Sequence, residues 1–239
     1  MRHLPFARLH NFRDLGGYPA RGGTVRWGLL YRSDSLGKLA GDDLARFTAL
    51  GVRTVIDLRH AYEIEARGRV PDLDGLSYHH LPIEHRPYDQ TSLGPDVDPG
   101  RYLADRYLEV AEDGAVELSA ALEVIADAEG PAVFHCASGK DRTGVLAALV
   151  LNAIGVSTVD IVEDFARTGL ATDRLLADWL AERPGSYTWP GYGRAPESAM
   201  RLFLADLSAA HGSVESYVAH HLRVAPATIT SLHRRFVGR

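Results

Sequence analysis

The sequence contains a single cysteine, Cys136, among 239 residues. One thiol cannot form an intramolecular disulfide, which excludes the disulfide-stabilised scaffolds typical of small secreted proteins. Long apolar runs are also missing, because the longest one, Gly144 to Val156, is too short to span a bilayer. The N-terminal residues include no apolar run of signal-peptide length. We therefore expect a cytoplasmic protein without stable membrane insertion, although secretion without a signal is compatible with the sequence.

Lysine is almost absent, because the chain contains 24 arginines but only two lysines, Lys38 and Lys140. The net charge of -5 provides no general attraction for nucleic acid or for an anionic membrane. We expect no nucleic-acid partner, and any anion that binds must be held by a local site. Lys140 is unusual, since this chain otherwise supplies positive charge as arginine.

Motifs for metal binding are missing as well. Eleven histidines are present, but the pairs at 79–80 and 220–221 do not have HExxH-type spacing. One cysteine cannot build a thiolate zinc site. We expect neither a metal nor another cofactor in the reaction.

The apolar pattern alternates between the periods of strands and helices along the first two thirds of the chain. Strands are predicted over 24–33, 52–59, 76–83 and 131–136, with helices over 42–51, 101–113, 115–130 and 143–155. This order predicts an α/β fold with a mostly parallel central sheet flanked by helices. From Ser157 onward the signals are only helical, so we expect one domain, 1–239, with extra C-terminal helices. Region 157–195 is a candidate helical lid. Within it, one helix face is apolar and is formed by Leu175, Leu176, Trp179 and Leu180. This face could pack against the core, cover the pocket as a lid or touch a membrane.

The stretch "FHCASGKDRTG", residues 134–144, lies between a predicted strand and a predicted helix. There the backbone N–H groups of residues 137–143 would curl around one point at a helix N-terminus, a geometry that binds anions. Gly139 permits the bend and a close approach of the chain to the anion. Arg142 can offer its planar guanidinium to two oxygens of a phosphate.

The same surroundings favour the nucleophilic thiolate of Cys136, which can attack a phosphorus atom in line and form a phosphocysteine. The hydroxyl of Thr143 could hydrogen-bond the sulfur, while Lys140 adds positive charge and Asp141 a carboxylate. The alternative is a buried, inert cysteine, which is the commoner role of a lone cysteine. The full pattern H-C-x-x-G-x-x-R-[ST]-G is too specific to favour that alternative.

"HCASGKDRTG" resembles the P-loop of cysteine-dependent protein tyrosine phosphatases, and its Lys140–Asp141 pair is similar to that of an atypical bacterial group within that family. The segments 11–18, 29–36 and 54–59 resemble signatures of the same group. The resemblance implies the fold of these phosphatases, with Cys136 as nucleophile and Arg142 as phosphate clamp. It also implies a loop whose phosphate-binding residues are Ala137, Ser138, Gly139, Lys140 and Thr143.

The resemblance fails at the general acid, because no aspartate stands where tyrosine phosphatases usually carry it on a mobile loop. Asp141 is our first candidate, since the loop fixes its position. Glu84, His85 and Asp89, which follow the third predicted strand, are the alternatives. An inefficient general acid would favour hydrolysis of phosphotyrosine over that of alkyl phosphates, because a phenol leaves with less protonation than an alkyl alcohol needs.

Other polar residues are expected to have supporting roles. Asp57 and Arg59 end the second predicted strand, where they either brace or extend the phosphate pocket or form a structural ion pair. Asn11, Arg13 and Asp14 are expected to hold the N-terminal segment near the pocket. His135 is expected to order the loop by a hydrogen bond.

The sequence thus predicts a phosphoric monoester hydrolase, a protein tyrosine phosphatase that uses a phosphocysteine intermediate and releases inorganic phosphate. Its substrates would be phosphorylated proteins, with possible breadth over phosphotyrosine, phosphoserine or phosphothreonine, and phosphoinositides. The alternatives are a phosphoinositide phosphatase, indicated by Lys140, and a phosphate-binding module with little catalytic activity. A redox or sulfur-transfer role lacks a resolving cysteine. The oligomeric state is left open by the sequence.

Overall fold

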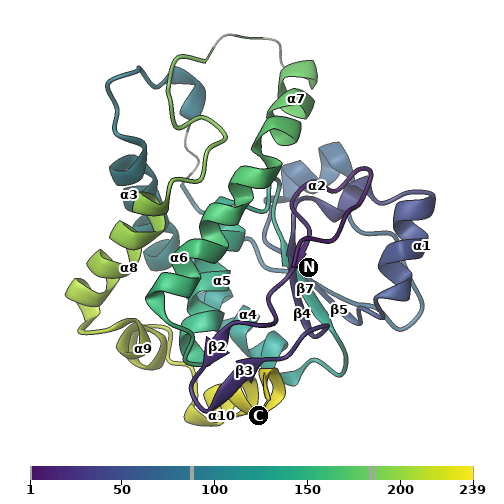
Figure 1. The fold of residues 1–239 in the computed structure, drawn as a ribbon, viewed down its shortest axis with the longest axis vertical. Helices are drawn as coiled ribbons and strands as arrows, with labels where there is room; N and C mark the ends of the chain where they lie inside the picture. The colour runs from purple at the N-terminus through teal and green to yellow at the C-terminus, as the bar shows by residue number, and fades with distance from the viewer. Residues whose placement is uncertain (1, 87–88, 183–184, 186, 239) are drawn as a thin grey trace.

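The computed structural model describes residues 2–86, 89–182, 185 and 187–238, and its centre is a five-stranded sheet (Figure 1). The strand order is β1-β4-β7-β5-β6, with bounds Arg13–Asp14, Leu30–Ser33, Ala132–His135, Thr54–Asp57 and Ser77–His80. Strands β4, β7, β5 and β6 are parallel, and only β1 is antiparallel to its neighbour. The predicted α/β class with a mostly parallel sheet is therefore confirmed.

A second, smaller sheet joins the two ends of the chain. It consists of β2 (Pro19–Ala20), β3 (Gly23–Val25) and β8 (Val237–Gly238), all antiparallel. The single strand predicted over 24–33 is wrong, because a turn with Gly28 at φ 77° separates β3 from β4 and sends them into different sheets. The expectation of only helices after Ser157 is wrong at β8, whose pairing partner lies more than 200 residues away in sequence.

The remaining elements are helices on both sides of the central sheet. Their bounds are α1 Asp42–Ala49, α2 Ala61–Arg67, α3 Pro99–Asp113, α4 Ala115–Asp127, α5 Asp141–Ala153, α6 Thr158–Ala166, α7 Thr172–Glu182, α8 Glu197–His211, α9 Val214–Ser216 and α10 Pro226–Phe236. Single helical turns add Leu36–Lys38, Gln90–Ser92, Arg167–Ala171 and Tyr217–His221. Helix α1 lies on one side of the sheet, while α3, α4, α5, α6, α8 and α10 lie on the other (Figure 1).

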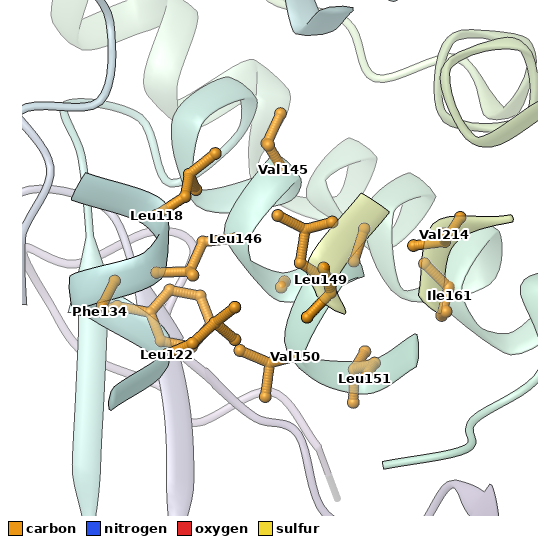
Figure 2. Packing of buried hydrophobic residues seen from close by; sticks show 14 of the residues in the cluster. Leu118, Leu122, Phe134, Val145, Leu146, Leu149, Val150, Leu151, Ile161 and Val214 are labelled. Atoms are coloured by element: carbon orange, nitrogen blue, oxygen red, sulfur yellow. The ribbon is translucent and has the colours of Figure 1, made fainter. Parts of the chain in front are cut away.

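Two hydrophobic clusters correspond to the two faces of the sheet. Alternate residues of β7 point to opposite sides, so Val133 joins the cluster that contains Phe47 of α1, and Phe134 joins the larger cluster around α5. Figure 2 shows Phe134 packed beside Leu122 and Leu146 in that larger cluster. Both faces of β7 are buried, as expected for a central parallel strand.

Helix α5 is buried on every side from Arg142 to Leu151, so it runs through the interior rather than over the surface. Such a helix needs apolar residues all round, which explains the sequence "VLAALVL". Gly144 allows close packing, because a Cβ there would lie 3.0 Å from the Phe165 ring. The N-terminus of α5 is thereby fixed at the carboxyl end of β7.

The candidate lid region contains α6 and α7, whereas residues 183–184 and 186 of that region lie outside the described residues. On α7, Leu175 is buried and Trp179 packs edge-on against Tyr192, so part of the apolar face has an ordinary packing role. Within the described segments, no helix combines the length and apolar character that crossing a membrane requires. The cytoplasmic location stays a prediction.

Candidate active site

The cysteine loop, residues 136–143, connects the end of β7 to the start of α5. Strand β7 lies between β4 and β5 at the centre of the sheet, so the loop opens at the carboxyl edge where ligands bind in open α/β sheets. Gly139 has φ 68°, and a Cβ at this position would lie 2.5 Å from the carbonyl oxygen of Ser33. Only glycine fits both the left-handed backbone and this contact.

The backbone amides of the cysteine loop are the donors expected to bind an anion, and we call them the cradle. Within the part of the chain that the structure describes, the N–H groups of Ala137, Gly139 and Arg142 have no acceptor, whereas the Lys140 N–H donates to the Ser138 hydroxyl at 3.3 Å. Free donors at the N-terminus of a long buried helix attract negative charge. Cys136, which is 1% exposed, lies at the start of this cradle.

Arg142 is held by two carboxylates. Its guanidinium donates to Glu63 Oε2 at 2.5 Å and Oε1 at 3.0 Å, and its Nε lies 3.1 Å from Glu84 Oε2. Burial lowers the pKa of Arg142, but hydrogen bonding to Glu63 and the negative charge of Cys136 outweigh burial and raise the pKa well above its usual value. The guanidinium is therefore a permanent, oriented cation beside the thiol.

Glu63, the carboxylate that pairs with Arg142, was missed by the sequence reasoning together with its helix α2. His60 and Glu63 form a capping box at the start of α2, in which the His60 N–H donates to Glu63 Oε2 at 2.8 Å. Burial raises the pKa of Glu63, but the hydrogen bonds and charge of Arg142 lower it overall. A glutamate three residues after a capping position was the available signal for this helix.

Asp141 and Lys140 lie next to each other at the edge of the cradle. The Tyr107 hydroxyl donates to Asp141 Oδ1 at 2.6 Å, and Lys140 Nζ lies 3.4 Å from the same oxygen. Lys140 is only 2% exposed, because its ammonium also donates to the backbone oxygen of Arg194 at 3.1 Å. The segment after α7 thus covers the lysine that the sequence singled out.

Glu84 lies closest to the cysteine loop among the alternative acids. Burial raises its pKa, and the charges of Asp141 and Glu63 add to this effect while Arg142 opposes it. His85 is turned toward Glu117, 3.5 Å away, and Asp89 is exposed and accepts hydrogen bonds from Thr91. Of these three residues, only Glu84 contacts Arg142 in the structure.

Two smaller expectations concern the residues beside the thiol. The Thr143 hydroxyl is buried and has no partner among the described residues, so the expected hydrogen bond to Cys136 is not formed. His135 Nδ1 lies 3.2 Å from the backbone oxygen of Cys136, which agrees with an ordering role. Burial lowers the pKa of His135 and favours the neutral ring.

A buried ionic network supports the cysteine loop from behind. Asp164 on α6 pairs with Arg13 at 3.1 Å and with Arg32 at 2.6 Å, and all three side chains are 1% exposed. Arg32 and Asn11 in turn donate to the backbone oxygen of Gly139, at 2.8 and 3.1 Å. The network fixes the Gly139 carbonyl and so helps to hold the backbone of the loop in place. Asn11 and Arg13 thus have the predicted supporting role.

Asp14 lies outside this support. Its carboxylate accepts hydrogen bonds from the N–H groups of Gly16 and Gly28, both at 2.7 Å, and so fixes the turns around β1 rather than the pocket. The prediction that Asp14 holds the N-terminal segment at the pocket is therefore wrong.

Asp57 and Arg59 form a structural brace. Their ion pair of 2.6 Å is fully buried, and Arg59 also donates to the Ser35 hydroxyl at 2.9 Å. Burial opposes ionisation of Asp57, but His135 and Arg59 lower its pKa to about 2. Of the two alternatives, the geometry favours the structural ion pair, because neither side chain reaches an open pocket.

The geometry so far places the single thiol beside free backbone amides and the guanidinium of Arg142. A sequence model described as "Tyrosine phosphatase family" matches residues 4–238. The chain is 32% identical over 206 residues to the triple specificity protein phosphatase PtpB of Mycobacterium tuberculosis, covering 74% of this chain and 72% of that protein. It is also 32% identical over 240 residues to a candidate tyrosine-protein phosphatase of Cupriavidus necator, covering 93% and 85%.

Among solved structures, the Siw14 catalytic core matches with a TM-score of 0.40 and 14% identity, over 94% of this chain and 98% of that one. The family model and the two curated relatives define the class as the phosphatases. Within it, the chain belongs to the tyrosine phosphatase family and is a protein tyrosine phosphatase.

Proposed function

We propose that this protein tyrosine phosphatase has broad specificity, acting on phosphotyrosine and also on phosphoserine, phosphothreonine and phosphoinositides. The observation that carries its chemistry is the position of the single cysteine, Cys136, in a cradle of free amides beside the oriented Arg142. The similarity to a relative named for triple specificity supports the breadth.

In the first step, the Cys136 thiolate attacks phosphorus, the S–P bond forms and the P–O bond to the substrate breaks. Arg142 and the loop amides stabilise the charge on the remaining phosphate oxygens, which is the largest contribution to such reactions. In the second step, water attacks the phosphocysteine and the S–P bond breaks. The products are the dephosphorylated alcohol or phenol, inorganic phosphate and the regenerated thiolate.

The leaving oxygen needs a proton, and two carboxyl groups of the site could supply it. Asp141, the first candidate, is fixed by the loop and accepts a hydrogen bond from Tyr107. Glu84 has a raised pKa and contacts the same guanidinium that would bind phosphate, so a larger fraction of it is protonated near neutral pH. We assign the acid to Glu84, with Asp141 as the alternative, and the same group would accept the proton of water in the second step.

The segment 157–195 would act as a cover for this site. On α7, Asp178 pairs with Lys38 and with His10, both at 2.9 Å, which ties the helix to the loops behind the cysteine loop. Farther along, the Arg194 backbone holds Lys140. Substrate that engages Lys140 must replace this backbone contact, which links substrate binding to movement of the cover.

Hydrolysis of para-nitrophenyl phosphate in the presence of a metal chelator tests the proposal. The wild type should turn over, whereas Cys136→Ser should lose the reaction and Arg142→Ala should lose phosphate binding as well as turnover. A wild type that binds phosphate but does not hydrolyse the substrate would instead support the alternative of a phosphate-binding module with little catalytic activity. Full activity of Cys136→Ser would contradict the phosphocysteine mechanism.

A further inference from the structure

Three potential metal ligands from separate segments meet outside the cysteine loop. They are Glu112 near the end of α3, His211 at the end of α8, and His221 at the end of the π-helical turn Tyr217–His221. One ligand atom of each residue lies within 4.8 Å of the others, and His221 Nε2 is 3.4 Å from Glu112 Oε2. We propose that these residues form a binding site for a divalent transition-metal ion of the zinc class.

The donor set and its spacing fit such an ion. Zinc binds imidazole nitrogen and carboxylate oxygen at about 2.0–2.2 Å, so two ligands in a tetrahedral site lie about 3.3–3.6 Å apart. The separation of 3.4 Å between His221 and Glu112 is already in this range. Two imidazoles with one carboxylate suit zinc, nickel or cobalt rather than calcium or magnesium, which prefer oxygen ligands.

The surroundings orient the two histidines. The Tyr217 ring stacks on His221 with centroids 5.2 Å apart and meets His211 edge-on at 5.0 Å. Tyr217 is itself fixed, because its hydroxyl donates to the backbone oxygen of Ala111 at 2.5 Å. The His211 side chain makes no hydrogen bond within the described part of the chain, so its ring nitrogens are free to bind an ion. Preorganised rings reduce the cost of binding.

The local electrostatics also favour a cation. Glu112 and His211 lie in the last turns of α3 and α8, where helix dipoles place partial negative charge. The neighbouring cation, Arg86, is paired with Asp113 at 2.6 Å, so its positive charge is balanced. A cavity of about 340 Å³ adjoins the site and includes Glu112, His211 and Tyr217 in its wall, which leaves room for a water ligand in the open position.

The role of this site is structural, beyond the phosphatase reaction. Tyr107, which contacts Asp141, lies five residues before Glu112 on α3, so the site is about 7.5 Å farther along the helix axis. A bound ion would tie the ends of α3 and α8 to the turn that follows α9. These segments pack on the side of the sheet that α5 covers, so binding would stabilise that side against unfolding.

Calorimetric titration with zinc chloride tests the proposal on untagged, full-length protein. The titration is made in a Cys136→Ser background, because the catalytic thiolate itself binds zinc. We expect saturable binding of one ion per chain. His211→Ala and His221→Ala should each weaken it by at least about ten-fold, whereas the matched control His220→Ala, which changes an exposed neighbour outside the cluster, should leave it unchanged.

Thermal unfolding provides a second measurement. Zinc should raise Tm in the Cys136→Ser parent and in its His220→Ala variant, but not in its His211→Ala variant. Glu112→Gln changes an exposed side chain without altering its shape, so it tests the site even if a histidine variant folds poorly. Absence of saturable zinc binding by the parent would overturn the proposal. Binding of equal affinity in His211→Ala, His221→Ala and Glu112→Gln would overturn it as well, since the ion would then lie elsewhere.

Discussion

The guanidinium of Arg142 and the carboxylate of Glu63 form a two-point ion pair, with N–O distances of 2.5 and 3.0 Å. Planar guanidinium and carboxylate groups joined at two points fix each other in orientation as well as position. Glu63 therefore fixes the orientation of the guanidinium that we propose binds phosphate. The pair joins two elements, α2 and α5, that are 79 residues apart in sequence.

Replacing Glu63 should impair catalysis without unfolding the protein. Glu63→Gln removes the charge and one of the two acceptors, so Arg142 loses its fixed orientation. We expect kcat/KM for para-nitrophenyl phosphate to fall by about 10- to 100-fold, because small misplacement of a binding group costs this much. Glu65→Gln, on an exposed position of the same helix, is the matched control and should keep wild-type kinetics. Equal kinetics of the two variants would remove Glu63 from its positioning role.

The pH profile of kcat distinguishes the two candidate acids. A general acid must be protonated to act, so activity falls as pH rises through its pKa and forms the basic limb of the profile. The pKa of Glu84 is raised by burial, which extends activity to higher pH than an ordinary glutamate would allow. We expect Glu84→Gln to lose the basic limb and Asp141→Asn to keep it. The reverse pattern would assign the acid to Asp141.

Asp164 should be essential for stability. It is the buried partner of both Arg13 and Arg32, and Asp164→Asn leaves these two cations without a counter-charge. We expect a loss of about 3–5 kcal/mol in the free energy of unfolding, measured by urea denaturation. Glu163→Gln, next in sequence, breaks only the exposed ion pair with Arg167 and should cost at most about 1 kcal/mol. Similar losses in the two variants would contradict the supporting role of the network.

The same carboxylate gives stability a defined dependence on pH. Burial raises the pKa of Asp164, but Arg13 and Arg32 reverse this and lower it from 3.8 to about 2. A lowered pKa stabilises the fold above pH 3.8, and this contribution is lost as pH falls from 3.8 toward 2. Acid denaturation followed by circular dichroism should show this loss in the wild type. Asp164→Asn should lack that part of the pH dependence.

Gly139→Ala should disrupt the cysteine loop. The new Cβ would lie 2.5 Å from the Ser33 carbonyl oxygen in a backbone with φ 68°. Gly22→Ala is a matched control, because its φ is 83° but nothing lies within 4 Å of its Cβ. We expect the control to lose about 1–2 kcal/mol of stability from backbone strain alone and to keep its activity. Gly139→Ala should lose more stability and nearly all activity, and an active variant would show that the loop geometry is not required.

Lys140 should decide between phosphotyrosine and phosphoinositide substrates. Its ammonium is at the edge of the cradle, where an additional phosphate could replace the Arg194 backbone oxygen. We expect Lys140→Ala to reduce kcat/KM for a phosphoinositide more than for a phosphotyrosine peptide. If wild-type activity on the inositide exceeds that on the peptide, the phosphoinositide phosphatase alternative is favoured. Equal reductions would show that Lys140 supports the loop without selecting the substrate.

The cysteine loop could be predicted from sequence because its chemistry is local. A bend, a helix N-terminus, a thiol and an arginine are all specified within the residues from Cys136 to Thr143, and the glycine requirement at Gly139 follows from the turn itself. The parallel sheet was likewise predictable, since apolar strands such as β5 and β7 are continuous in sequence. Short strands such as β2 and β8 were missed, because they exist only through pairing with distant partners.

By itself the sequence determined the fold class, and it predicted the nucleophile and the phosphate cradle. Each of these depends on neighbouring residues or on regular periodicity. Only the tertiary structure decided which carboxylate holds Arg142, which residues support Gly139, and that Lys140 is covered by the backbone of Arg194. It also brought His221 to His211 and Glu112, where spacing along the chain gave no metal motif. The physical reason is that ion pairs and shared ligand sites depend on distance in space, and long-range packing of helices on the sheet sets those distances.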